Sequence, residues 1–391
     1  MSNNSVYIVS ACRTPIGAFN GQFSKIPAVT LASTAIRETI RRCNIDSASV
    51  SEVIMGHVIT TGLGQNTARQ AALLAGLPND IPACTVNMVC GSGLKAVYDG
   101  FNSIKTGENS IVVCGGMENM SMAKHFANLR SGCKLGAIQM EDTILTDGLV
   151  DSNIKMHMGK TAEHLVREYK VSRVEQDEFA FQSQRKAQDA ITNGYFKEEL
   201  IGVEDSKGNL IEKDEHIRFG TTLEGLAKLK PAFETDGSVT AGNASGINDG
   251  AAALLICNFD VLKEKQFNPL ARIVGFAQCG LEPIEMGLGP IKAIRKLMEK
   301  TKWSLEEVDL FEINEAFAVQ SLLVVKALNI DSDKVNVSGG AIALGHPIGC
   351  SGARVLVTLL YNLRRLGKRK GVAALCIGGG MGIAVAVEID A

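Results

Sequence analysis

Short apolar segments alternate with amphipathic helical patterns in two separate parts of the chain. The helical patterns that open at Cys90 and at Cys350 each lead into an apolar, strand-like segment. Segments 5–11, 50–56 and 110–118 match segments 270–276, 308–314 and 371–381 in order and spacing. Such alternation predicts βαβ units on largely parallel sheets. We therefore expect two similar α/β halves that pack together with a pocket between them.

Residues from about 119 to 249 have no counterpart in this repeat. They contain one long helical pattern that starts at Ser172, where Ser172 and Gln176 suggest an imperfect capping box. An insertion of this size between βαβ elements is usually functional, because plain connections are short. We therefore predict an N-terminal half at 1–118, completed by about 250–268, an inserted loop domain at 119–249 that shapes the substrate site, and a C-terminal half at 269–391.

The composition is ordinary for a globular protein of more than one domain. Of 391 residues, 46% are apolar and 21% are charged, and the net charge is −2. This balance provides no basic surface for nucleic acid or for an anionic membrane, and no apolar run approaches the roughly 18 residues of a membrane span. The first residues lack the basic and apolar regions of a signal peptide, so we expect a cytoplasmic location.

Glycine-rich settings mark three residues with reactive side chains. Cys90 lies in Val-Cys-Gly-Ser-Gly, Cys376 in Cys-Ile-Gly-Gly-Gly, and His346 in Leu-Gly-His-Pro-Ile-Gly. Glycine beside a reactive side chain lets a substrate or another backbone come close. Two thiols and an imidazole in such settings indicate a nucleophile, a base and a second acid or base, which is the equipment for covalent acyl transfer.

We interpret the other cysteines and histidines, with the exception of His157, as residues that serve the fold and not the chemistry. The ten cysteines form no Cys-x-x-Cys pair, so we expect no metal site. A glycine-rich nucleotide-binding loop of a dehydrogenase is also excluded, because no helix follows Gly378 to Gly382.

The motifs together resemble the thiolase family over nearly the whole chain. The resemblance rests on Cys90-Gly-Ser-Gly, Gly-Gly-Met117-Glu-Asn-Met-Ser, Asn314-Glu-Ala-Phe, Gly-His346-Pro-Ile-Gly and Cys376-Ile-Gly-Gly-Gly, in this order. It implies a duplicated α/β fold of five layers, αβαβα, with an inserted loop domain. It also implies an acyltransferase that reversibly condenses two acetyl-CoA molecules to acetoacetyl-CoA and CoA, by a ping-pong mechanism with an acyl-enzyme on Cys90.

The resemblance also implies a role for each catalytic residue. Cys90 accepts the acyl group, and the start of a helix at this residue would favour its thiolate. His346 acts as the base for Cys90 with one nitrogen, and its other nitrogen helps to form an oxyanion hole with a water held by Asn314. Cys376 removes the methyl proton of the second acetyl-CoA. The backbone N–H groups of Cys90 and Gly378 form the oxyanion hole of the acyl-enzyme.

The family correspondence further assigns the CoA thioester contacts. They map to Leu149, His157, Met158, Arg218, Phe233, Ala241 and Ser245 in the insertion, and to Phe317 in the core. The pair His157-Met158 resembles the short-chain type, and Met286 is expected to close the acyl pocket as in that type. CoA thioesters are then substrates, no cofactor is expected, and a homotetramer is usual.

Two alternatives stay open at this point. A degradative 3-ketoacyl-CoA thiolase of broad chain length is the second candidate function. Related ketoacyl synthases use a second histidine where this chain has Asn314, which favours a thiolase. A reversible disulfide between Cys90 and Cys376 is a further hypothesis, because both sulfurs must reach the same substrate atoms.

Overall fold

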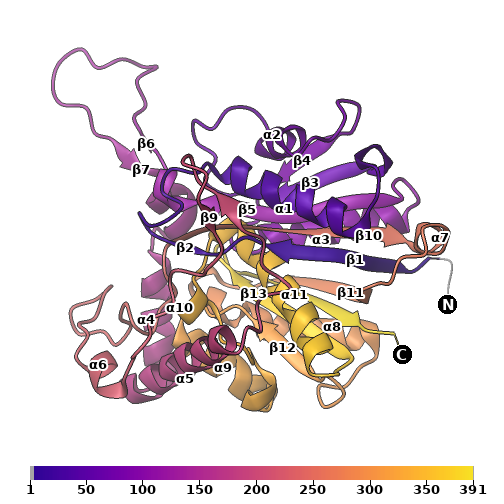
Figure 1. The fold of residues 1–391 in the computed structure, drawn as a ribbon. Helices are drawn as coiled ribbons and strands as arrows, with labels where there is room; N and C mark the ends of the chain where they lie inside the picture. The colour runs from indigo at the N-terminus through magenta and orange to yellow at the C-terminus, as the bar shows by residue number, and fades with distance from the viewer. Residues whose placement is uncertain (1–3, 391) are drawn as a thin grey trace.

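The two halves contain a similar order of strands and helices in the computed structural model, which describes residues 4–390, but the second half has no strand that corresponds to β4 of the first (Figure 1). The first half comprises β1 (Val6–Arg13), α1 (Ala28–Cys43), β3 (Glu52–Gly56), α2 (Thr67–Leu74), β4 (Ala83–Val86), α3 (Ser92–Lys105), β5 (Ile111–Asn119) and β10 (Asn248–Asn258). The second half comprises β11 (Ala271–Gly280), α8 (Gly289–Thr301), β12 (Leu310–Ile313), α9 (Ala318–Leu328), α11 (Ile348–Arg365), β13 (Lys370–Ile377) and β14 (Met381–Glu388).

The sheet is mixed, so the expectation of largely parallel sheets is wrong. The strands run in the order β12-β13-β14-β11-β1-β10-β5-β3-β4, with β2 (Gly17–Ala18) attached to β10. Only the outer pairs β12–β13, β3–β5 and β3–β4 are parallel, and every central pair is antiparallel. The reason is that β14 follows β13 through a short glycine turn, which can join only antiparallel neighbours. In the first half, β10 likewise returns antiparallel to β5 after the insertion.

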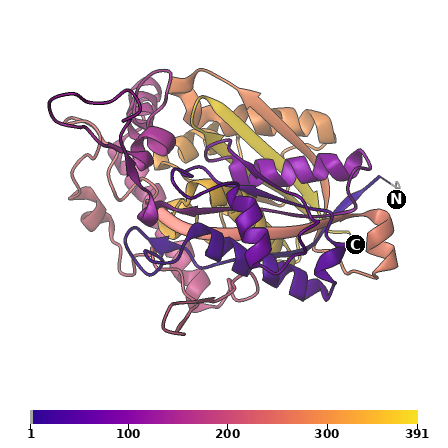
Figure 2. The same ribbon diagram turned by 90° about the horizontal axis from the view of Figure 1, so that it is seen from above.

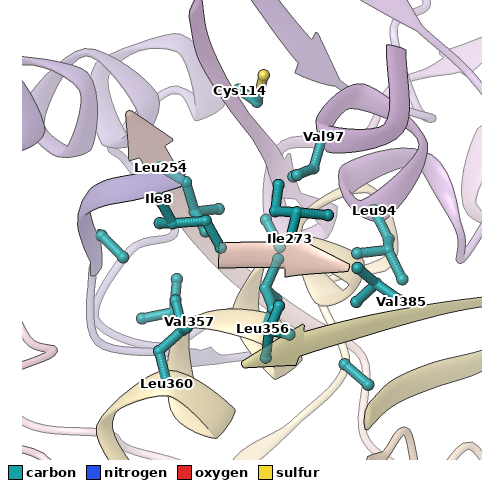
Figure 3. Close-up of a cluster of buried hydrophobic side chains, with 14 of the residues drawn as sticks. Ile8, Leu94, Val97, Cys114, Leu254, Ile273, Leu356, Val357, Leu360 and Val385 are labelled. Carbon is teal, nitrogen blue, oxygen red and sulfur yellow. The ribbon is translucent and has the colours of Figure 1, made fainter. Parts of the chain in front are cut away.

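Alternating side chains of the strands explain the layers of the fold. In β1, Ile8 packs into the central core, while Tyr7 packs on the opposite face with α1 and α2. In β14, Val385 packs into the same central core, while Ala384 packs with α8 and α9. Helices α3 and α11 therefore lie between the two halves of the sheet, where Figure 3 shows their side chains meeting. This arrangement confirms the predicted five-layer, duplicated fold.

The insertion lies at the end of the molecule opposite the two termini (Figures 1 and 2). It contains β6 (His125–Phe126), β7 (Glu141–Asp142), α4 (Met158–Tyr169), α5 (Arg173–Thr192), β8 (Val203–Glu204), β9 (Leu210–Ile211) and α6 (Leu223–Ala227). The loop between β6 and β7 extends far from the body (Figure 1). The remaining helices are α7 (Phe259–Glu264) and α10 (Ala341–Leu344).

Helix α5 begins with a complete capping box, which corrects the predicted one. The side chain of Ser172 accepts a hydrogen bond from the backbone N–H of Glu175, and the Glu175 carboxylate accepts one from the N–H of Ser172. The partner is therefore Glu175 at the third helical position, not Gln176, as the geometry of the motif requires.

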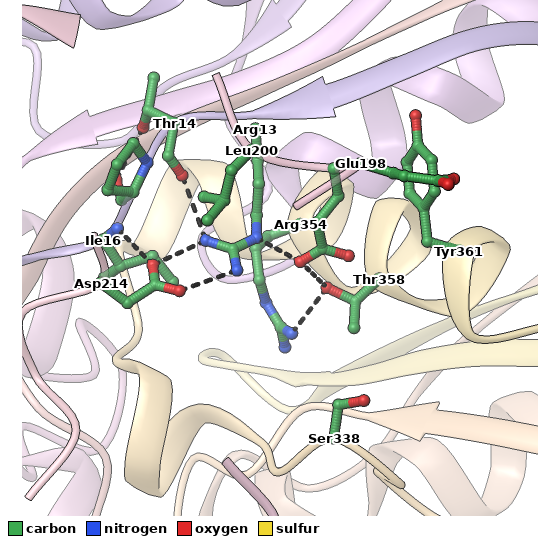
Figure 4. A network of polar contacts seen from close by, with 12 residues as sticks. Arg13, Thr14, Ile16, Glu198, Leu200, Asp214, Ser338, Arg354, Thr358 and Tyr361 are labelled. Atoms are coloured by element: carbon green, nitrogen blue, oxygen red, sulfur yellow. Dashed lines mark hydrogen bonds and ion pairs between the residues drawn. The ribbon is translucent and has the colours of Figure 1, made fainter. Parts of the chain in front are cut away.

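A buried charged network ties the insertion to the core (Figure 4). Arg13 at the end of β1 donates to Glu199 at 2.6 Å and to Asp214 at 2.7 and 2.9 Å. Thr358 of α11 donates to the same Glu199 carboxylate at 3.2 Å. Burial alone would lower the pKa of Arg13, but Asp214 and Glu199 raise it above its usual value. Because removing one partner of a buried pair typically costs about 3–5 kcal/mol, this network fixes the insertion firmly beside α11.

The predicted domain boundaries stay a prediction. Their outermost residues, 1–3 and 391, lie outside the described part of the chain.

Candidate functional site

The two central helices bring the predicted catalytic residues together at their N-terminal ends. Cys90 and His346 each lie two residues before a helix, α3 and α11 respectively. The helices approach so closely that a Cβ on Gly93 would lie 2.7 Å from the backbone nitrogen of Ala353. A Cβ on Gly352 would lie 2.3 Å from the backbone nitrogen of Leu94. Glycine at these contacts therefore allows both helix ends to face one cavity.

The backbone around Cys90 is held in an unusual conformation. Val89 has a φ of 46°, in the left-handed region that a β-branched residue rarely adopts. A Cβ on Gly91 would lie 2.4 Å from Cδ1 of Ile377, so a larger residue after the cysteine would force the Ile377 side chain to shift. Strain of this kind persists only where the surrounding structure imposes it, and here it presents the Cys90 thiol to the cavity.

Burial, rather than the helix end, dominates the ionisation of Cys90. Burial raises the pKa of its thiol to about 11, although hydrogen bonds from the backbone N–H groups of Gly378 and of Cys90 itself favour the thiolate. The backbone N–H groups thus favour the thiolate as expected, but burial outweighs their effect. The same two N–H groups are those predicted for the oxyanion hole of the acyl-enzyme.

The backbone of His346 is fixed from both sides. Its N–H donates to Oδ1 of Asn248 at 2.9 Å, and Nδ2 of Asn248 donates to the carbonyl of Gly17 at 2.9 Å. The preceding Gly345 has a φ of 105°, and a Cβ there would lie 2.4 Å from the Asn248 side chain. Sequence analysis missed Asn248, which lies at the start of β10 and reaches the site only through the tertiary fold.

The two nitrogens of the His346 ring have different partners. Nδ1 lies 2.6 Å from Oγ of Ser351, and Nε2 lies 3.5 Å from Nδ2 of Asn314. Oδ1 of Asn314 is buried and has no hydrogen-bond partner within residues 4–390. Burial, helped by the charge of Arg354, lowers the pKa of His346 to about 4. The ring is therefore neutral near pH 7. The prediction that one nitrogen acts as the base and the other forms part of the oxyanion hole does not fit, because Nδ1 already contacts Ser351.

Cys376 lies near the end of β13 and is 1% exposed. Burial and the nearby Cys90 raise the pKa of its thiol far above the usual value. The turn after the strand uses Gly379 and Gly380, with φ values of 86° and 76°. Both candidate thiols are thus protonated at rest. A disulfide between Cys90 and Cys376 stays a prediction, and these raised pKa values disfavour the thiolate that would start it.

All of the predicted site residues except Asn314 and Gly378 line one cavity of about 650 Å³. The predicted residues that line it are Cys90, Leu149, His157, Met158, Arg218, Phe233, Ala241, Ser245, Met286, Phe317, His346 and Cys376.

An aromatic stack shapes the side of the cavity formed by the insertion. The rings of His157 and Phe233 are stacked with centroids 4.9 Å apart, and Phe233 meets Phe317 edge-on at 6.1 Å. Nδ1 of His157 accepts a hydrogen bond from the N–H of Gly159 at the start of α4. A Cβ on Gly159 would lie 2.3 Å from the Phe233 ring, so glycine permits this packing. The wall is largely apolar, as expected around a flexible thioester arm.

Sequence analysis missed two prominent residues of the wall, Phe19 and His216. His216 received only a structural interpretation, but it lies in the cavity and its ring packs against the backbone of Gly246. Burial lowers the pKa of His216 to about 4. The sequence contained one signal for His216. It lies two residues before Arg218, which was predicted to contact the substrate and also lines the cavity.

The first half has a counterpart of this site whose polar groups are occupied. His57 directly follows β3, and its Nδ1 lies 2.9 Å from Oγ1 of Thr67 while its Nε2 lies 3.1 Å from Oε1 of Glu118. The buried Glu118 carboxylate also accepts a hydrogen bond from the N–H of Gly349 in the first turn of α11 at 2.9 Å. The N-terminal end of α11 thus already has an anion bound to it.

Between residues 4 and 390, no three or more histidine, cysteine, aspartate or glutamate side chains are grouped in a way that could hold a metal ion. Over the same residues, no helix has the length and apolar character needed to cross a membrane.

Comparison with known families gives two matches that together span the chain. The family of the thiolase N-terminal domain matches residues 6–260, and that of the thiolase C-terminal domain matches residues 267–389. Acetyl-CoA acetyltransferase of Rhizobium meliloti is 51% identical over 391 residues, covering 99% of this chain and 100% of that protein. Cytosolic acetyl-CoA acetyltransferase of Rattus norvegicus is also 51% identical, covering 99% of this chain and 98% of its own length.

Solved structures show the same fold. The crystal structure of the Bacillus anthracis acetyl-CoA acetyltransferase has a TM-score of 0.96 and 46% identity, with 98% of each chain covered. The structure of human mitochondrial 3-ketoacyl-CoA thiolase has a TM-score of 0.96 and 43% identity, with all of both chains covered.

Proposed function

Because the chain belongs to the thiolase family, we propose that it reversibly condenses two acetyl-CoA molecules to acetoacetyl-CoA and CoA. The observation that carries the proposal is that the half-buried thiol of Cys90, the buried thiol of Cys376 and the neutral ring of His346 line one cavity. The names of the relatives at about 50% identity support acetyl-CoA as the substrate.

In the proposed first stage, Cys90 becomes acetylated. The thiol of Cys90 gives its proton to Nε2 of His346, and the sulfur attacks the thioester carbonyl of acetyl-CoA. The backbone N–H groups of Cys90 and Gly378 stabilise the oxyanion of the tetrahedral intermediate. When the carbon–sulfur bond of CoA breaks, the leaving thiolate takes the proton of Cys376. This stage ends with acetyl-Cys90, free CoA, a Cys376 thiolate and a protonated His346.

In the second stage, the Cys376 thiolate removes a proton from the methyl group of a second acetyl-CoA. The enolate oxygen is stabilised by Nε2–H of His346 and by a water on Asn314, whose buried Oδ1 otherwise lacks a partner. The enolate carbon attacks acetyl-Cys90, and the Cys90 sulfur leaves and regains its proton from His346. Acetoacetyl-CoA is released, and every side chain returns to its starting protonation state.

The raised pKa of both thiols fits this sequence of transfers. In this sequence Cys90 loses its proton only as it attacks acetyl-CoA, and Cys376 loses its proton only to the departing CoA. Neither thiolate therefore persists in the free enzyme. The buried Cys376 is therefore a strong base at the moment when the acetyl methyl group must be deprotonated.

Other parts of the proposal rest on the family alone. CoA thioesters act as substrates and no further cofactor is needed. A cytoplasmic location is supported by the rat and mouse relatives, which are named as cytosolic enzymes. A homotetramer is proposed, with the insertion as the source of its contacts.

A degradative 3-ketoacyl-CoA thiolase of broad chain length is the second candidate function. The full-length likeness to the human mitochondrial 3-ketoacyl-CoA thiolase favours it. Against it stands Met286, which is 3% exposed and closes the cavity near Cys376 and Phe317. A longer acyl chain would have to displace this buried side chain.

Thiolysis of acetoacetyl-, 3-ketohexanoyl- and 3-ketodecanoyl-CoA separates the two candidates. We expect kcat/KM to fall by at least about 100-fold between the four-carbon and the ten-carbon substrate, because the longer acyl chain would have to displace Met286. A comparable kcat/KM on 3-ketodecanoyl-CoA would assign the chain to the degradative type instead. No turnover of any of the three would overturn both candidates.

A further inference from the structure

A buried serine forms the shortest polar contact of the His346 ring. Oγ of Ser351 lies 2.6 Å from Nδ1 of His346 and 2.9 Å from the backbone carbonyl of Pro347. Ser351 is fully buried in the first turn of α11, five residues after the histidine. None of the motifs used to predict the catalytic residues assigns it a role.

The direction of these two hydrogen bonds follows from the chemistry of the groups. A carbonyl oxygen can only accept, so the contact between Ser351 and Pro347 is a hydrogen bond only when the single hydroxyl proton of Ser351 points to Pro347. The hydroxyl oxygen must then accept from the imidazole, which places the ring proton on Nδ1 of His346. Nε2 is left unprotonated, and it is the nitrogen beside Asn314.

We propose that Ser351 is a positioning residue that holds the His346 ring in the tautomer able to take the proton of Cys90. The proposal rests on the acyl-enzyme function proposed above and adds a residue to it. Ser351 touches no reacting atom. It acts by preventing the alternative tautomer, in which Nε2 would carry a proton and could not serve as the base.

The neutral character of the hydroxyl is part of the role. In catalytic triads a carboxylate holds the histidine and stabilises the imidazolium that forms. Ser351 offers only a neutral oxygen, and the ring is enclosed among buried groups. The imidazolium formed during acetylation is therefore short of stabilisation, which promotes the return of its proton to Cys90 at the end of the cycle.

The test compares two buried serines that make the same backbone bond. Ser33 in α1 is also buried and donates to the carbonyl of Thr30 at 2.9 Å, but it contacts no histidine. Ser351→Ala and Ser33→Ala therefore lose the same kind of hydrogen bond. The acetylation of Cys90 by acetyl-CoA is followed by rapid quench and mass spectrometry, over a range of acetyl-CoA concentrations.

We expect Ser351→Ala to lower the maximal acetylation rate roughly 10- to 100-fold, because a hydrogen bond no longer selects the reactive tautomer. The acetyl-CoA concentration at half-maximal rate should stay within about twofold, since the cavity is unchanged. Ser33→Ala should acetylate at the wild-type rate. Ser351→Thr keeps the hydroxyl and should recover most of the rate.

Equal maximal rates in Ser351→Ala and wild type would overturn the proposal, as would equal losses in Ser351→Ala and Ser33→Ala at equal thermal stability. If Ser351→Thr does not fold, the comparison of the two alanine variants decides alone. Failure of the wild type itself to acetylate Cys90 would instead overturn the proposed function, so the two failures are distinguishable.

Discussion

His57 in the first half and Asn314 in the second half each directly follow a strand with a parallel neighbour, β3 and β12 respectively. The ring of His57 lies between Thr67 and Glu118, whereas Oδ1 of Asn314 has no partner among residues 4–390. The N-terminal end of α11 holds the Glu118 carboxylate through Gly349, whereas the end of α3 is left open beside the cavity.

The difference indicates how a duplicated scaffold can carry a single site. The repeat supplies two helix ends and two strand ends, and all of them could bind an anion or a polar group. One set lies against partners from within the protein and stabilises the fold, although Nε2 of His57 contacts Glu118 without forming a hydrogen bond. The other set is left unsatisfied, at a cost in stability, and is available to the substrate.

The largest expected effect is on the rate of Cys90 acetylation when His346 and His57 are each replaced in a separate variant. His346→Ala should lower the rate of Cys90 acetylation by about 10³-fold, because a general base contributes 10²- to 10⁴-fold. His57→Gln should leave this rate within a few-fold, since the first-half set serves the fold. Stopped-flow release of CoA measures both variants. A large loss of acetylation in folded His57→Gln would contradict the separation of roles.

Asn314→Ala should have the next largest effect. We expect kcat for condensation to fall by about 100-fold, the typical result of removing one oxyanion-hole donor, while Cys90 acetylation persists. The reason is that the water on Oδ1 of Asn314 serves the enolate, which forms only in the second stage. Parallel assays of acetoacetyl-CoA formation and of acetyl-enzyme formation check this, and an equal loss in both would place Asn314 in the first stage.

Glu118→Gln should act on stability through the occupied helix end. The amide removes the negative charge that the N–H of Gly349 and the ring of His57 both contact. We expect the free energy of unfolding to fall by about 1–3 kcal/mol. Urea titration followed by circular dichroism measures the change, with Glu307→Gln on the surface as the control. An unchanged midpoint would show that this carboxylate does not stabilise the fold.

The smallest effect concerns the ionisation of Cys90 in the free enzyme. Since burial raises the pKa of this thiol to about 11, its thiolate fraction should rise about tenfold per pH unit from pH 7 to pH 10. The rate of alkylation of the Cys90 peptide by iodoacetamide should follow this rise. A simple thiol with a pKa near 8.5 levels off above about pH 9 and serves as the control. A plateau for Cys90 below pH 8 would show that the helix end outweighs burial.

Much of this account follows from the sequence, because glycine leaves a clear signal. The glycines around Cys90, His346 and Cys376 mark places where the backbone must come close, and the repeat predicts that two of these places meet. The antiparallel centre of the sheet could not be predicted, since strand direction depends on how β10 returns after a long insertion. Ser351 and Asn248 were not predicted, because only the folded chain brings their side chains into contact with His346. The net ionisation of Cys90 depends on burial, which local sequence does not report.

Peptide mapping of the Cys376→Ser variant after mixing with acetyl-CoA tests the central claim most directly. The claim is that the open end of α3 carries the acyl group and that the thiol on β13 moves the methyl proton. The account predicts an acetyl group on the Cys90 peptide together with loss of exchange of the acetyl methyl protons with solvent. An acetyl group on any other residue with Cys90 unmodified, or methyl exchange at the wild-type rate, would contradict it.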